Sequence, residues 1–183
     1  MTLRHAFFAA ALTALACASS ARAAELIVPV PGAGWHLRMD VPAGMQPADK
    51  APGALYAGRA DRFQVSAFAE AHEWCPGPDT NENIYACYTA ILRKSPIADW
   101  NSERGNTAAN GVHVMYMTRG EVDGKKGSAF NINVLFAHGG KWIDVHFSVA
   151  APRPEDADAI LAAAASVAAV DDGAPAAKAA SAP

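Results

Sequence analysis

The chain has 183 residues, a formal net charge of −3, 51% hydrophobic residues and 18% charged residues. These values are typical of one ordinary globular domain. A nucleic-acid-binding protein needs a strongly basic face, and the near-neutral balance of this chain excludes that class. We therefore expect no nucleic-acid partner.

The N-terminus has the pattern of a secretory signal peptide. Arg4 and His5 precede an apolar run from residue 6 to residue 18, and small residues follow up to Ala23. The run is shorter than the roughly 20 residues that a membrane-spanning helix needs, and no later segment is longer. The sequence predicts cleavage after Ala23 and a periplasmic or secreted bacterial protein without a membrane span. The alternative is a lipoprotein anchored through Cys17, which follows a small residue.

Cleavage would change both the charge and the cysteine count. Loss of Arg4 and Arg22 leaves 13 basic against 18 acidic residues, a net charge of −5. Cys75 and Cys87 would be the remaining cysteines, and an even pair in an oxidising compartment predicts one disulfide. So short a loop would stabilise the domain by on the order of 3 kcal/mol.

The organisation of the mature chain is that of a single domain. No internal repeat is visible, and about 160 residues are too few for two comfortable domains. We expect one α+β domain over residues 24–170 and a disordered tail, rich in alanine and proline, over residues 171–183.

The first half of the domain predicts several short strands and then a helix. The strands are expected at residues 26–30, 35–41, 55–59 and 63–70. Asp79 is expected to cap the helix, with Glu82 completing a capping box, and Ser95-Pro96 ends it. Steps of three and four place one apolar stripe on this helix, made of Ile84, Cys87, Tyr88, Ile91 and Leu92.

The second half predicts a three-stranded antiparallel meander. Strands at 112–122, 130–137 and 141–149 are joined by the turn signals Asp123-Gly124 and Gly139-Gly140. In the last hairpin, apolar residues face one another in the pairs Phe136 and Ile143, Val134 and Val145, Ile132 and Phe147, and Phe130 and Val149. The opposite face is mostly polar and carries Asn131, Asn133, Leu135, Trp142, Asp144, His146 and Ser148.

A closing helix is expected from Pro154 to Val170. Acidic residues follow Pro154 and suit the positive end of a helix dipole. The residues expected to face the sheet are Ile160, Leu161, Val167 and Val170. The fold class is therefore α+β, with an antiparallel sheet and a C-terminal β-meander packed against two helices.

At the level of topology, the chain resembles the PsbP-like and DcrB-like bacterial exported proteins. The resemblance rests on the opening segment Val30-Pro31-Gly32-Ala33-Gly34-Trp35, the two long hairpin strands and the closing segment Glu155 to Val170. It implies an α/β/α sandwich and an accessory or binding role.

Catalytic chemistry has no clear signature in the sequence. Asp144, His146 and Ser148 share one strand face, but successive side chains on that face stand about 6.6 Å apart, too far for a hydrogen-bonded relay. We expect no enzyme and no cofactor.

The polar hairpin face predicts a binding surface instead. Amides, an imidazole and an exposed indole combine directional hydrogen bonds with stacking, which suits a peptide, glycan or protein partner from the envelope. The expected binding residues are Trp142, His146, Asn133, Asn131 and Asp144. The alternative is that another element covers this face.

A soft-metal site is a second hypothesis. His113, Met115 and Met117 alternate along one strand, and an imidazole with two thioethers suits cuprous ion. In the simplest register, however, these residues lie on the core side of the sheet, where they would serve as packing.

Overall fold

The computed structural model describes residues 23–71, 76–122 and 125–173. The helices and strands, in chain order, are β1 (Ala23–Pro29), β2 (Trp35–Pro42), β3 (Gln46–Pro47), β4 (Tyr56–Ala60), β5 (Phe63–Ala71), α1 (Asn81–Leu92), β6 (Ala98–Ala108), β7 (Gly111–Val122), β8 (Lys125–His138), β9 (Lys141–Ala150), α2 (Asp156–Ser166) and β10 (Ala168–Asp171). The predicted α+β class is confirmed. Neither helix is long and apolar enough to cross a membrane, within the part of the chain that the structure describes.

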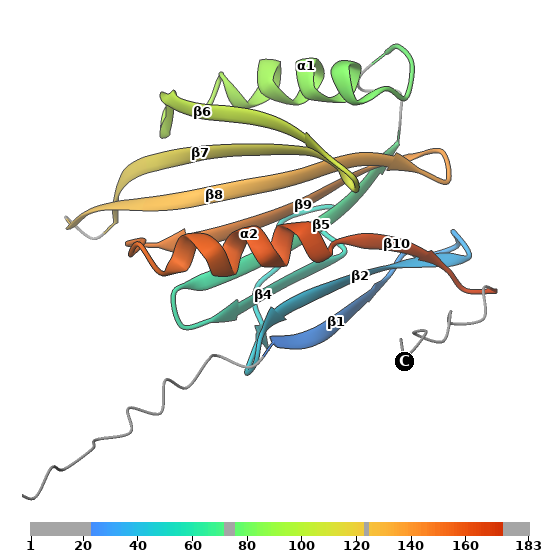
Figure 1. Ribbon diagram of the computed structural model, residues 1–183, viewed down its shortest axis with the longest axis horizontal. Coiled ribbons are helices and arrows are strands. Elements are labelled where there is room, and N and C mark those ends of the chain that lie inside the picture. The colour runs from blue at the N-terminus through green and yellow to red at the C-terminus, as the bar shows by residue number, and fades with distance from the viewer. Residues whose placement is uncertain (1–22, 72–75, 123–124, 174–183) are drawn as a thin grey trace, which may run out of the picture.

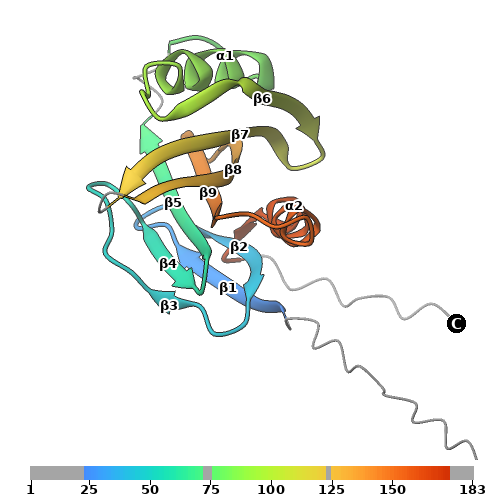
Figure 2. The same ribbon diagram turned by 90° about the vertical axis from the view of Figure 1, so that its left-hand side faces the viewer.

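The strands form two antiparallel sheets. Seven strands pair in the order β3-β4-β5-β9-β8-β7-β6, and a smaller sheet has the order β1-β2-β10. Figure 1 shows α1 above the β6, β7 and β8 end of the large sheet, with α2 and the small sheet across from it. The turned view in Figure 2 shows the same arrangement of layers.

Two apolar cores lie on opposite faces of the large sheet. The larger core joins that sheet to the small sheet and α2 through residues such as Leu37, Phe147 and Ile160. The smaller core lies under α1 and includes Ile84, Val114 and Leu135. Because successive residues of a strand point to opposite faces, β7, β8 and β9 contribute to both cores.

The predicted meander is confirmed in detail. β8 and β9 pair with Phe136 opposite Ile143 and with Ile132 opposite Phe147, as the apolar pattern indicated. β7 pairs with β8 so that Met115 lies opposite Ile132. The Gly139-Gly140 turn and the apolar alternation therefore determined the register of the β8–β9 hairpin, because a slip of one residue would have moved the apolar side chains to the other face.

Helix α1 begins one residue later than the capping-box pattern predicts. Thr80 is the N-cap, and its Oγ1 accepts a hydrogen bond from the backbone N–H of Asn83 at 3.3 Å. Asp79 instead accepts a hydrogen bond from the Trp142 indole N–H. The predicted stripe is also rotated, because Ile91 is 48% exposed whereas Thr89 is buried.

Replacing the observed cap tests this assignment. Thr80→Ala removes the side-chain acceptor for a free helix amide, and we expect a loss of about 1 kcal/mol in the free energy of unfolding. Urea unfolding followed by circular dichroism measures the loss. Ser95→Ala, outside the helix, is the control, and an equal effect of the two changes would contradict the cap.

Helix α2 is shorter than predicted. It ends at Ser166, and the following residues form β10, which pairs with β2 and places Val170 opposite His36. Backbone groups at the edge of β2 need hydrogen-bond partners, and the β-branched residues Val167 and Val170 suit an extended segment. Leu161 is also 40% exposed rather than facing the sheet.

The C-terminal boundary of the domain differs accordingly. Asp171 is the last residue of β10, and the Asp172 backbone N–H donates to the Gly34 carbonyl oxygen at 3.0 Å. The Asp172 carboxylate lies 2.8 Å from Nδ1 of His36. The ordered domain thus extends beyond residue 170, and residues 174–183 of the expected tail lie outside the described residues.

Candidate functional site

The polar face of the β8–β9 hairpin is divided into a covered half and an uncovered half. Trp142 is 4% exposed and Asn133 is 1% exposed, and Asn131 is also buried. Trp142 packs in the core under α1, and its Nε1 donates to Asp79 Oδ1 at 3.2 Å. The expectation that Trp142, Asn131 and Asn133 form an exposed binding surface is therefore wrong, because α1 and its neighbours cover them.

Asp144 belongs to a polar cluster beneath α1. Asn133 Nδ2 donates to Asp144 Oδ1 at 2.7 Å, and Tyr88 and Tyr116 pack in the smaller core next to them. Burial, with a smaller contribution from the charge of Glu70 and against the opposing effect of the Asn133 amide, raises the pKa of Asp144 to about 7. The surroundings of Asp144 therefore make it a structural residue of the hairpin.

His146 lies at the border of the uncovered half. Asn131 Nδ2 donates to the backbone oxygen of Ala129, so Asn131 Oδ1 is left to accept from His146 Nε2, 3.0 Å away. Nε2 therefore carries the proton and Nδ1 is a hydrogen-bond acceptor. Burial lowers the pKa of His146 to about 4, so the ring is neutral at pH 7.

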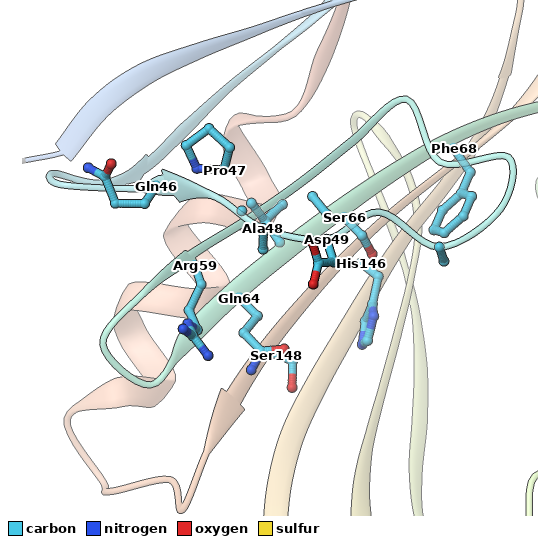
Figure 3. Close-up of a pocket in the computed structure, with 14 residues that line it drawn as sticks. Gln46, Pro47, Ala48, Asp49, Arg59, Gln64, Ser66, Phe68, His146 and Ser148 are labelled. Carbon is cyan, nitrogen blue, oxygen red and sulfur yellow. The ribbon is translucent and has the colours of Figure 1, made fainter.

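The uncovered half forms a pocket of about 780 Å³ on the face of the large sheet. Figure 3 shows its polar side chains above β4, β5 and β9, with the segment after β3 passing over them. The first cross-strand row on the pocket floor consists of Gln46, Arg59, Gln64 and Ser148. The second row consists of Ala48, Ala57, Ser66 and His146.

Two opposite charges lie in this pocket without pairing to each other. Arg59 belongs to the first row, and Asp49 follows Ala48 of the second row. Among the described residues, neither the Arg59 guanidinium nor the Asp49 carboxylate forms a salt bridge or side-chain hydrogen bond. Figure 3 shows the two groups on either side of Gln64. The pocket therefore presents one free cation and one free anion, separated by neutral polar groups.

The arrangement does not favour hydrolysis. Asp144 and His146 are hydrogen-bonded to different asparagines, so they form no relay with Ser148. A neutral imidazole whose pKa is about 4 is also a weak base at pH 7. These contacts suit ligand binding better than nucleophilic chemistry.

The candidate copper ligands lie on the core side of the sheet. His113 is 5% exposed, and its Nε2 lies 2.8 Å from Asn110 Oδ1. Asn110 Nδ2 in turn donates to the Ala164 carbonyl oxygen of α2, and Met115 packs against the larger core. His113 and Met115 thus contribute to packing between the sheet and α2, which disfavours a metal site.

Two other sequence predictions depend on residues outside the described part of the chain. Cys87 lies on α1, but Cys75 falls outside the described residues, so the Cys75–Cys87 disulfide stays a prediction. Residues 1–22 of the expected signal peptide, with Cys17, also lie outside them.

Most of the pocket residues were not identified from the sequence. Gln64 and Ser66 alternate with the buried residues Phe63 and Val65, a pattern that could have indicated a polar strand face. It could not show that this face continues that of β9, because β5 and β9 are distant in the sequence. Asp49 lies in a connecting segment with no periodic signal.

Comparisons with known proteins add no assignment. No protein-family model matches the chain, and no curated protein sequence matches it either. The resemblance to PsbP-like and DcrB-like proteins therefore stays a prediction at the level of topology.

Proposed function

We propose that this chain is an exported bacterial envelope protein with an accessory, non-enzymatic role, and that it binds a small polar ligand in the pocket above β4, β5 and β9. The pattern of residues 1–23 supports export. The observation that carries the binding proposal is the uncovered polar pocket with its two unpaired charges, Arg59 and Asp49. This pocket replaces the Trp142 end of the hairpin as the binding surface.

The contrast between the two halves of the polar face supports a ligand site. Under α1, the Trp142 indole N–H donates to Asp79 and the Asn133 amide N–H donates to Asp144. In the pocket, Arg59, Gln64 and Ser148 have no side-chain hydrogen bond to another described residue. Convergent polar groups with unused hydrogen-bonding capacity are what fix and orient a small ligand.

Amide chemical shifts test the binding site. We expect a pool of short peptides and neutral oligosaccharides, added to ¹⁵N-labelled residues 24–183, to shift amides of β4, β5 and β9 around the pocket. Arg59→Gln should abolish or strongly weaken these shifts, because it removes the charged hydrogen-bond donor of the pocket. Arg38→Gln is the matched control, because Arg38 is an exposed arginine on β2.

The location of the shifts decides the outcome. Shifts confined to another surface, shifts that Arg59→Gln leaves unchanged, or no shifts with any component of the pool would each contradict the proposed pocket.

A further inference from the structure

The opposite signs of the two unpaired charges restrict the ligand. Arg59 lies in the first row of the pocket floor, and Asp49 follows Ala48 of the second row. A ligand that contacts both side chains at once therefore needs both an anionic group and a cationic group.

The other lining groups carry no further charge in the space between Arg59 and Asp49. Gln64, Ser66 and Ser148 are neutral donors and acceptors, and the neutral ring of His146 offers Nδ1 as an acceptor. Phe68 adds an aromatic ring at the far side of the pocket, as Figure 3 shows. One peptide group, which has one N–H and one carbonyl, would find partners among these side chains.

We propose that the ligand is a small zwitterion, namely a short peptide with free ends. Its carboxylate binds the Arg59 guanidinium, its ammonium group binds the Asp49 carboxylate, and its peptide group bonds to the neutral side chains between them. This inference rests on the proposed binding function and specifies its ligand.

Other ligand classes fit these charges less well. An anionic ligand would be repelled by the Asp49 carboxylate. A neutral saccharide would supply no opposite charge to Arg59 or to Asp49. A longer peptide that adds a strand to a sheet needs a free sheet edge, whereas the pocket floor is a sheet face.

Blocked dipeptides provide the direct test by calorimetric titration into residues 24–183. The ligands are alanyl-alanine, its N-acetylated form, its C-terminal amide, free alanine, tetra-alanine and a neutral disaccharide. We expect alanyl-alanine to bind more tightly than either blocked form and the disaccharide. Each blocking group should weaken binding by about tenfold or more, since each removes a charge-assisted hydrogen bond.

Matched variants assign each end of the ligand to its protein partner. Arg59→Gln should weaken binding of alanyl-alanine by about tenfold but leave the affinity for its C-terminal amide nearly unchanged. Asp49→Asn should also weaken binding of alanyl-alanine by about tenfold, and it should leave the affinity for the N-acetylated form nearly unchanged. Both residues are exposed, so the variants should fold normally, and Arg38→Gln should bind like the unmodified protein.

The outcomes separate this inference from the proposed function. Equal affinity for free and blocked dipeptides, or pocket binding of the disaccharide alone, would overturn the zwitterionic peptide and leave the pocket as a binding site. Absence of binding by every ligand, together with no amide shifts from the pool, would overturn both proposals.

Discussion

Asp144→Asn is expected to raise the free energy of unfolding by about 4 kcal/mol above pH 7, relative to the unmodified protein. Burial raises the pKa of Asp144 from 3.8 to about 7, so ionisation in the folded state is costly. The folded protein therefore loses stability as the pH rises from about 4 to about 7. Asparagine cannot ionise, and its side-chain oxygen can still accept from Asn133.

The decisive measurement is how the difference in free energy of unfolding between Asp144→Asn and the unmodified protein changes with pH. Urea unfolding at pH 4, 5.5, 7 and 8.5 should give a gain that is small at pH 4 and complete above pH 7. Asp40→Asn, which changes an exposed carboxylate on β2, is the control and should show little dependence on pH. A gain that is independent of pH, or a loss of stability at pH 8.5, would refute the assigned environment of Asp144.

Ile160→Ala should cost about 2–5 kcal/mol, whereas Leu161→Ala should cost less than about 1 kcal/mol. Ile160 is 0% exposed in the larger core, but its neighbour Leu161 is 40% exposed. The two changes remove comparable side chains from adjacent positions of α2 and differ mainly in burial. Thermal and urea unfolding measure both losses, and equal losses would mean that α2 has a different rotation.

The same pair of residues shows why the face of α2 was mispredicted. Apolar residues in an alanine-rich segment leave the helical stripe poorly defined, so both Ile160 and Leu161 were assigned to the sheet side. In the structure, α2 packs against β2 and β9, and this packing buries Ile160 in the larger core. The helix ends at Ser166 because the following residues pair with β2, and the β-branched residues Val167 and Val170 are only a weak local signal for this end.

Some features of the candidate site could likewise be predicted from neighbouring residues in the sequence, whereas others depend on residues far apart in the chain. The polar character of His146 and Ser148 is visible in the alternation of β9, which a short turn pairs with β8. The pairing of β5 with β9 and the position of Asp49 depend on residues far apart in the chain. The burial of Trp142 likewise depends on α1, which folds over the sheet from another part of the chain.

The sequence by itself determined the near-neutral composition, the α+β class, the meander and the register of its hairpin. These features are local, because a two-residue turn and a period-two apolar pattern admit only one pairing that buries the apolar face. Only the tertiary structure decided which half of the polar face is covered. That choice depends on where α1 and the segment after β3 pack, and it leaves Arg59 and Asp49 unpaired above one uncovered region of the sheet.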